Sequence, residues 1–260
     1  MKNRLRIVGL ASFLFGCFQV QQLAVADTQQ VETQQAANNT SHPIIEYLWQ
    51  STGPEFTEQR LAEIATALNK RIDTQGYEVI TANILRPQFE TEDYDLIWVF
   101  LWSSEDARNQ AWAHWNEFQA TDWQRETAGV LKSESGRSFL YDLLWGYKSP
   151  ELNLVAGDTF FSTFHFCSFE GTHSHDALQA FKAQYNDWLS QNAEVMRYGY
   201  LTLKARFELK DTDFVWLDIF DHEGTRQAKA EHWSGTEAQK LWKQMTSCDE
   251  FQFSSTKIRS

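Results

Sequence analysis

The sequence repeats itself at an offset of 118 residues, and this repeat limits the possible folds more than any other feature. Residues 47–116 and 165–234 align without gaps and share residues of rare types in register. The matched pairs include Gly53/Gly171, Phe89/Phe207, Trp98/Trp216, Arg108/Arg226, His114/His232 and Trp115/Trp233. Chance similarity would not keep tryptophan and histidine in register, so the chain carries a duplicated domain.

Both copies predict the same order of secondary structure. Alternating and helical apolar spacing indicates a strand, a helix, two strands, a Trp-rich helical region and a last strand. In the first copy we expect these at 44–49, 57–69, 77–85, 95–102, 105–131 and 138–145. In the second copy we expect them at 159–167, 175–189, 196–207, 213–220, 223–245 and 251–258. This β-α-β-β-α-β order is that of the ferredoxin-like unit.

Two ferredoxin-like repeats in one chain predict a particular architecture. The helices of each repeat cover one face of its sheet and leave the other bare, and two repeats can bury both bare faces against each other. We therefore expect an α+β fold in which the tandem repeats form an intramolecular, pseudo-dimeric α/β-barrel. The expected boundaries are 1–26 for a signal peptide, 27–41 for a disordered leader, 42–148 for repeat 1, 149–158 for a linker and 159–260 for repeat 2.

Aromatic spacing in the first repeat resembles a known family. The run WVFLWSSEDARNQAW from Trp98 to Trp112, followed by TDW ending at Trp123, is similar to the NIPSNAP-type pattern of a tryptophan strand, a helix-starting arginine and a late Asp-Trp step. The second copy lacks that aspartate and keeps the other steps at Trp216, Arg226 and Trp242. The wider dimeric α/β-barrel superfamily includes cofactor-free monooxygenases, haem enzymes and members without known activity. The resemblance therefore implies the fold rather than a reaction.

The N-terminus predicts export. Three basic residues within 1–6 precede an apolar stretch at 7–20, and the tripeptide AVA ending at Ala26 fits the small-x-small rule for signal peptidase. Alternatively, the tetrapeptide LFGC ending at Cys17 resembles a bacterial lipobox, in which Cys17 would carry a lipid anchor. The apolar stretch is too short for a good membrane span. Both alternatives predict a periplasmic or secreted protein.

The net charge argues against nucleic acids as partners. The chain carries 35 acidic and 23 basic residues, a formal charge of −12, and loss of the basic signal peptide would lower this charge to −15. Such a surface repels phosphate backbones and anionic lipid headgroups, so we expect no nucleic-acid partner. The sequence also contains no phosphate-binding glycine loop, G-x-S-x-G elbow or CxxC pair, which argues against phosphoryl transfer, serine hydrolysis and thiol redox chemistry.

Side-chain parity in the third strands suggests a ligand-binding face. Aliphatic residues occupy one face of each of these strands, and mainly aromatic residues occupy the other. If the helices cover the aliphatic face, the aromatic face lines a cavity between the repeats in which a small hydrophobic or aromatic molecule would bind. The expected ligand-binding residues are Tyr47, Trp98, Phe100, Trp102, Phe214, Trp216 and Phe220. A packed aromatic core is the alternative.

One titratable pair distinguishes the second repeat from the first. At the offset of 118, His165 and Asp218 correspond to Tyr47 and Phe100. We expect the first and third strands of the repeat to be parallel neighbours, with His165 and Asp218 at one level on the cavity face. An aspartate that holds a histidine raises its basicity, so the pair is a candidate catalytic base with its orienting carboxylate. A hydrogen-bonded pair at the cavity rim is the alternative.

Other histidines suggest metal or haem ligands. His173 and His175 follow His165 closely and could coordinate zinc or copper with it, but the spacing matches no zinc motif, and a helix cap is the alternative for this segment. His114 and His232 recur on the Trp-rich helices, where they could bind haem or pack against neighbouring side chains. We expect no cofactor and no metal, with haem or a metal ion as the alternative.

Two cysteines are left after cleavage at Ala26, in an oxidising compartment. Cys167 ends the first strand of repeat 2, and Cys248 immediately precedes the fourth. These strands are antiparallel neighbours in a ferredoxin-like unit, so the two ends lie together. We therefore predict a Cys167–Cys248 disulfide.

Four functional hypotheses follow from these features. The first is binding of a small hydrophobic or aromatic molecule between the repeats, without catalysis. The second is a cofactor-free oxygenase or isomerase that uses the His165/Asp218 pair, which would need an open cavity beside that pair. The third is a periplasmic haem or metal-binding protein. The fourth is a structural or interaction module, which a filled interior would favour.

Overall fold

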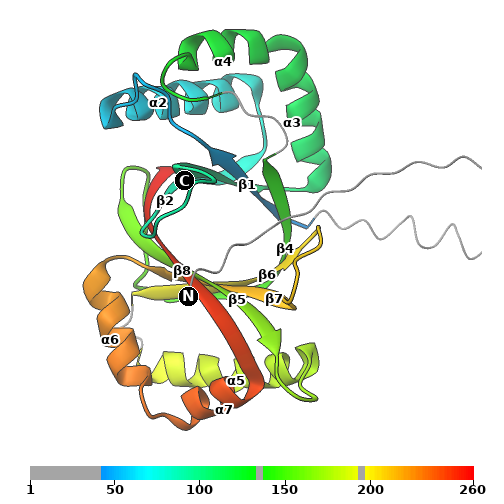
Figure 1. The fold of residues 1–260 in the computed structure, drawn as a ribbon, viewed down its shortest axis with the longest axis vertical. Helices are drawn as coiled ribbons and strands as arrows, with labels where there is room; N and C mark the ends of the chain where they lie inside the picture. The colour runs from blue at the N-terminus through cyan, green and yellow to red at the C-terminus, as the bar shows by residue number, and fades with distance from the viewer. Residues whose placement is uncertain (1–41, 133–136, 193–196) are drawn as a thin grey trace, which may run out of the picture. The chain divides into compact units, whose positions relative to one another are not determined.

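A computed structural model describes residues 42–132, 137–192 and 197–260. These residues form a closed, eight-stranded antiparallel barrel with helices on two opposite sides (Figure 1), which confirms the expected α+β fold of tandem ferredoxin-like repeats. The signal peptide expected at 1–26, the leader expected at 27–41 and the alternative lipid anchor at Cys17 lie outside the described residues. Within the described ranges, no helix has the length and apolar character needed to cross a bilayer.

The strands follow the same order in both repeats. Repeat 1 contains β1 (Ile44–Gln50), β2 (Val79–Pro87), β3 (Leu96–Trp102) and β4 (Ser138–Lys148). Repeat 2 contains β5 (Thr159–Phe169), β6 (Tyr198–Ala205), β7 (Phe214–Phe220) and β8 (Thr246–Arg259). The order around the barrel is β1-β3-β2-β8-β5-β7-β6-β4. Because β2 pairs with β8 and β4 pairs with β6, the last strand of each repeat joins the second strand of the other.

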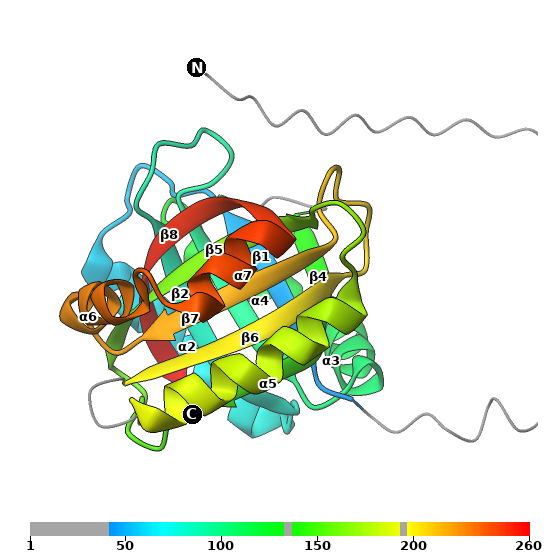
Figure 2. The same ribbon diagram turned by 90° about the horizontal axis from the view of Figure 1, so that it is seen from below.

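Helices cover the outer face of each half of the barrel. Repeat 1 contains α2 (Glu58–Gln75), α3 (Glu105–Phe118) and α4 (Ala120–Thr127). Repeat 2 contains α5 (His175–Gln191), α6 (Glu223–Trp233) and α7 (Glu237–Met245). Figure 2 shows α5 and α7 lying over the strands of repeat 2, with α5 running roughly along the direction of β6. Each Trp-rich region thus forms two helices, and Gly235 separates α6 from α7 at a φ of 77°, a conformation that favours glycine.

Polar side chains cap the first turns of these helices. The hydroxyl of Thr57 accepts a hydrogen bond from the backbone N–H of Arg60 at 3.1 Å at the start of α2. Ser174 accepts one from the backbone N–H of Asp176 at 3.3 Å at the start of α5. Such caps satisfy N–H groups that the helix itself cannot pair. The cap at Ser174 confirms the helix-cap interpretation of the segment that contains His175.

The predicted assignment of the strand faces is wrong. The aromatic face of β3 and β7 packs beneath the helices, and the aliphatic face points into the barrel. The interior of an eight-stranded barrel is narrow, and the aliphatic groups of β3 and β7 pack there with rings from other strands. The large rings of β3 and β7 fill the layer between sheet and helices. The expected ligand-binding residues buried in that outer layer are Trp98, Phe100, Trp102, Phe214, Trp216 and Phe220. Tyr47 lies in the barrel interior.

Side chains fill the barrel interior, where the sequence predicted a ligand-binding cavity between the repeats. The buried interior residues are each at most 7% exposed. They are Ile45, Tyr47, Leu85, Ile97, Val99, Tyr141, Phe164, Leu203, Val215, Leu217 and Phe253. A small molecule therefore cannot enter this region without displacing packed side chains.

The two repeats differ by one residue in their first strands. The third strands match at the offset of 118, which makes Asp218 the counterpart of Phe100. Phe100 pairs with Glu46 in β1, whereas Asp218 pairs with Thr163 in β5. Glu46 and Thr163 are 117 residues apart, so the first strands match at an offset of 117 instead.

This shift of one residue explains why the predicted face of His165 is wrong. At an offset of 117, His165 matches Leu48, which packs on the helix-facing side, and Phe164 matches Tyr47 in the interior. Side chains alternate along a strand, so a slip of one residue exchanges the two faces. The rings of Tyr47 and Phe164 meet at 5.6 Å, where the first strands of the two repeats face each other inside the barrel.

The predicted Cys167–Cys248 disulfide is confirmed. The two residues lie directly opposite each other in β5 and β8, with their Cα atoms 4.1 Å apart. Cys248 lies within its strand rather than before it, because β8 already begins at Thr246. The disulfide joins the first and last strands of repeat 2 across 81 residues, which reduces the conformational entropy of the unfolded chain.

We expect Tyr47→Phe to leave the free energy of unfolding unchanged or to raise it by up to about 1 kcal/mol. The hydroxyl of Tyr47 is buried and has no hydrogen-bond partner among the described residues, so its removal ends a desolvation cost. The matched control is Tyr198→Phe, since Tyr198 donates to the buried carboxylate of Asp218. Loss of that bond should cost about 1–3 kcal/mol. Urea unfolding measures both variants, and equal losses would contradict this account.

Candidate functional site

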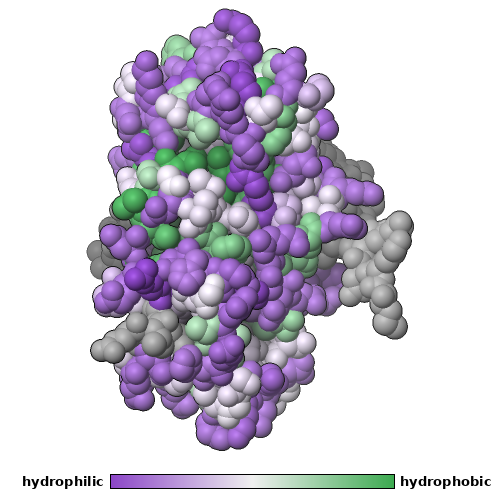
Figure 3. Space-filling view, turned by 90° about the vertical axis from the view of Figure 1, so that its left-hand side faces the viewer, coloured by the Kyte–Doolittle hydropathy of each residue, from purple (hydrophilic) through white to green (hydrophobic). Residues whose placement is uncertain are grey.

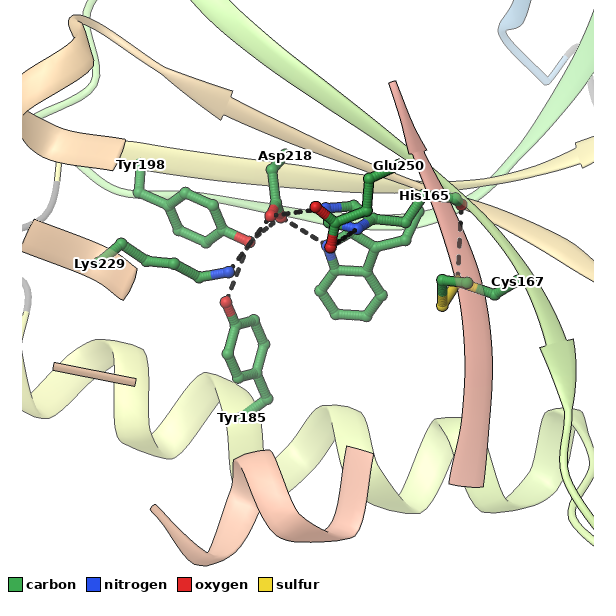
Figure 4. Close-up of polar contacts among 9 residues, drawn as sticks. His165, Cys167, Tyr185, Tyr198, Asp218, Lys229 and Glu250 are labelled. Atoms are coloured by element: carbon green, nitrogen blue, oxygen red, sulfur yellow. Dashed lines mark hydrogen bonds and ion pairs between the residues drawn. A yellow bond between two sulfur atoms is a disulfide. The ribbon is translucent and has the colours of Figure 1, made fainter. Parts of the chain in front are cut away.

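A buried carboxylate, Asp218 of β7, is the centre of a polar network beneath the helices of repeat 2 (Figure 4). Asp218 is only 3% exposed. Its Oδ1 accepts hydrogen bonds from the hydroxyl of Tyr198 and from the indole N–H of Trp216, the latter at 2.6 Å. Its Oδ2 faces Nε2 of His165 and Nζ of Lys229, each at 3.2 Å. Four side chains thus satisfy the two oxygens.

His165 and Asp218 meet, but not in the predicted arrangement. β5 and β7 are antiparallel rather than parallel, and His165 lies opposite Trp216, so its contact with Asp218 is diagonal. Nδ1 of His165 lies 3.2 Å from Oε1 of Glu250 on β8. Both ring nitrogens therefore face carboxylates. The pair lies between the sheet and the helices, rather than on a cavity between the repeats.

Lys229 of α6 is a member of this network that the sequence motifs do not predict. Its ammonium group lies 3.2 Å from Asp218 and above three aromatic rings, whose faces attract a cation. The rings are those of Tyr185, Tyr198 and Trp233, with centroids 5.9, 5.3 and 5.7 Å away. The signal in the sequence is an asymmetry between the repeats, because Ala111 occupies the matching position in repeat 1.

The network holds its members in their charged forms. Burial opposes charge on Asp218, but Lys229 and His165 outweigh it and lower the pKa of this carboxyl below its usual range. Burial also opposes charge on His165, yet its hydrogen bonds to Asp218 and Glu250 raise its pKa to about 9. A histidine that is protonated at neutral pH and faces two carboxylates cannot accept a proton from a substrate. The geometry therefore favours a structural ion network over a general base.

Repeat 1 contains a second buried carboxylate that the sequence motifs do not predict. Glu46 of β1 is 0% exposed. Its Oε2 accepts hydrogen bonds from the indole N–H groups of Trp102 and Trp112, both at 2.9 Å. Its Oε1 accepts from the guanidinium of Arg108 and from the hydroxyl of Ser138, the latter at 2.6 Å. The strand register places Glu46 at the level that the central aspartate occupies in repeat 2.

The other candidate histidines lie at the start of α5 and on the two Trp-rich helices α3 and α6. Nδ1 of His114 shares a hydrogen bond of 2.7 Å with the hydroxyl of Tyr77. His173 and His175 are exposed at the start of α5, and His232 is exposed on α6. In the ranges that the structure describes, no group of three or more His, Cys, Asp or Glu side chains is arranged to hold a metal ion.

Haem does not fit the residues around His165. A histidine that binds haem iron needs a nitrogen with a free lone pair, and both nitrogens of His165 face carboxylates. The layer beneath α5 and α7 is filled by aromatic rings in contact with one another. Trp216 lies 4.9 Å from Trp242 and 5.5 Å from Tyr185 between ring centroids. A planar cofactor would have to displace this packed cluster.

A groove of about 460 Å³ lies on repeat 1, away from both buried carboxylates. The segment before α2 and the hairpin between β2 and β3 form its walls. Phe56, Phe89 and Tyr94 give it aromatic surface, and an ion pair between Arg86 and Glu58 lies along one side. None of the predicted ligand-binding residues lines this groove.

Comparisons with known proteins concern the fold. No protein-family profile and no curated protein sequence matches the chain. Among solved structures, an anthrone oxidase-like protein is similar with a TM-score of 0.50 at 12% sequence identity, over 85% of this chain and 93% of that one. A proposed monooxygenase from Fusobacterium nucleatum subsp. nucleatum gives a TM-score of 0.51 at 8% identity, over 85% and 94% of the two chains. The shared fold is an α/β-barrel formed by two ferredoxin-like repeats of one chain.

A chlorite dismutase variant from Candidatus Nitrospira defluvii is also similar to this α/β-barrel. Its TM-score is 0.49 at 10% identity, over 86% of this chain and 95% of that one. Identities this low show a shared fold and transfer no activity.

Lys229→Met should lower the free energy of unfolding of the α/β-barrel by roughly 3–5 kcal/mol, because it removes one partner of a buried ion pair. The double variant Asp218→Asn with Lys229→Met should recover part of this loss, since it removes both charges. Urea unfolding of wild type, both single variants and the double variant measures the coupling. Losses that simply add would contradict a direct interaction between the two side chains.

The stability of the α/β-barrel should fall as the pH rises from about 6.5 to about 9. The pKa of His165 is raised from 6.5 to about 9, so the stabilisation by its charged form is complete below 6.5 and is lost as the pH passes through 9. His165→Gln should remove most of this slope. Urea midpoints at several pH values for both proteins test this, and an unchanged slope in the variant would assign the effect to other groups.

Proposed function

We propose that this protein binds a small hydrophobic or aromatic molecule without transforming it, and that the binding site is the groove on repeat 1. The observation that carries this proposal is the aromatic lining of the groove by Phe56, Phe89 and Tyr94. Ligand pockets are typically concave, with aromatic walls and a few polar groups. The proposal keeps the ligand class expected from the sequence and moves the site from the barrel interior to its outer surface.

The aromatic walls of the groove are held by packing against other rings. Tyr94 lies 4.6 Å from Trp49 between ring centroids, and Phe89 lies 5.3 Å from Phe251 and 5.4 Å from Phe253. Side chains fixed in this way lose little conformational entropy when a ligand packs against them. Figure 3 shows hydrophobic side chains gathered at mid-height on the side of the molecule that carries β2 and β8, within a largely hydrophilic surface.

Differences between the repeats support a specialised site on repeat 1. In the second hairpin, Thr212 stands where the first has Tyr94, and Lys210 stands where the first has Glu92. Phe89 is shared with repeat 2 as Phe207, so the difference in the aromatic wall lies at Tyr94. The ring that Tyr94 contributes is therefore found on the hairpin of repeat 1 and not on that of repeat 2.

The state of the charged network supports binding rather than catalysis. A base that uses His165 would need a nitrogen with a free lone pair and an adjacent space for substrate. His165 instead faces Asp218 and Glu250, in a layer packed with aromatic rings.

Export to the periplasm or beyond, with cleavage after Ala26 or lipidation at Cys17, is part of the proposal. The NIPSNAP-like motif stays a prediction.

The neutral aromatic probe 1-naphthol should bind the groove and shift the amide resonances of the β2–β3 hairpin in a two-dimensional NMR titration. Tyr94→Ala should weaken this binding by about fivefold to tenfold, because one aromatic contact contributes about 1 kcal/mol. The control is Phe118→Ala, which removes an exposed ring from α3 outside the groove and should leave the affinity unchanged. Urea unfolding checks that both variants are folded.

Two results would contradict the proposal. Shifts confined to residues outside the groove would place the binding surface elsewhere. Absence of binding by 1-naphthol at millimolar concentration would favour the structural or interaction module, which the filled barrel interior also supports.

A further inference from the structure

We propose that the natural ligand of the groove is an organic cation, with an aromatic or aliphatic body that packs against Phe56, Phe89 and Tyr94. This inference rests on the binding function proposed above and adds the sign of the ligand's charge. It follows from two properties of the groove, the charge of its rim and the electrostatics of its aromatic walls.

Carboxylates dominate the rim of the groove. The hairpin segment ETEDYD at 90–95 carries four carboxylates in six residues, and two of them, Glu90 and Asp95, line the groove. Glu58 lines the opposite wall, where it pairs with Arg86. Because that ion pair is neutral, Glu90 and Asp95 leave the lining with a net negative charge.

Asp95 is held in place as an anion. Its Oδ2 accepts hydrogen bonds from the backbone N–H and the hydroxyl of Thr52, at 2.7 and 2.8 Å. The backbone hydrogen bond is the main reason that its pKa is lowered, and the nearby charge of Lys132 adds to this effect. Asp95 is therefore ionised at neutral pH, beside the ring of Tyr94.

Other charged groups near the groove do not reverse its sign. The charge of Lys132 acts on Asp95, but Lys132 is exposed to solvent, which screens its charge. Arg137 donates a hydrogen bond to the backbone oxygen of Asp93. Glu92 and Asp93 add two more negative charges to the same hairpin.

Aromatic walls and nearby carboxylates act on a cation in the same direction. The face of an aromatic ring carries partial negative charge, so Phe56, Phe89 and Tyr94 attract an ammonium group as well as an apolar body. The carboxylates of Glu90 and Asp95 add Coulomb attraction, about 1 kcal/mol for a solvent-exposed pair at 4 Å. An anionic ligand would meet repulsion from both, and Arg86 is the one cation among the described residues that line the groove.

Three probes with the same ring test the sign of the charge. Benzyltrimethylammonium, benzyl alcohol and benzenesulfonate are titrated into the protein and followed by NMR at 20 mM and 150 mM salt. We expect the cation to bind at least fivefold more tightly than the alcohol, as expected for about 1 kcal/mol. The advantage should shrink at the higher salt concentration, because ions screen exposed charges.

Glu90→Gln provides the variant test. It should reduce the affinity for the cation about twofold to fivefold, and by more than it reduces the affinity for the alcohol. The matched control is Glu117→Gln, which removes an exposed carboxylate from α3 outside the groove and should change neither affinity. Glu90 is exposed, so this substitution should not disturb folding.

Each other outcome has a separate meaning. Equal affinities for cation and alcohol, both reduced by Tyr94→Ala, would overturn the charge preference and leave groove binding intact. Tighter binding of benzenesulfonate, lost in Arg86→Gln, would assign the groove to an anion and overturn the inference. Absence of groove shifts with all three probes would overturn both the inference and the proposed function.

Discussion

Closure of the barrel by two seams between the repeats is the constraint on which the other features depend. The β2–β8 and β4–β6 pairings complete a ring whose interior is filled by side chains. The aliphatic side chains of β3 and β7 lie in that interior, and the large rings of these two strands pack beneath the helices. The carboxylates Glu46 and Asp218 face this outer layer, where water cannot reach them. Indole, hydroxyl and cationic groups must therefore satisfy them.

The element order and the disulfide could be predicted because they depend on local periodicity and on the topology of one familiar unit. The faces could not be predicted, since they depend on a shift of one residue between β1 and β5 that leaves the surrounding sequence match intact. The alternation of side chains along the first strand of repeat 2 therefore predicted the wrong face of the sheet for His165. The groove could not be predicted from the sequence for a different reason. Phe56 and Tyr94 come from separate segments that only tertiary packing brings together.

A histidine beside an aspartate is not by itself a catalytic pair. His165 and Asp218 are close enough to act together, but Glu250 and Lys229 change what the pair can do. Two carboxylates and two cations form a compact ion network in which each charge has an opposite neighbour. Such a network holds β5, β7, β8 and α6 in one arrangement, and a buried group that loses its partner there is costly. These two extra members come from other elements, so no motif in one segment reveals them.

The two seams also affect how copies of the chain can associate. Each seam joins one repeat to the other, and its hydrogen bonds would be the same if the two repeats came from different chains. The linker at 149–158 can extend to roughly 33–36 Å, which gives the repeats room to separate. Two opened molecules can therefore exchange halves and close as an intertwined dimer with two complete barrels. A barrel built from two repeats of one chain thus also permits a two-chain form with the same strand pairing.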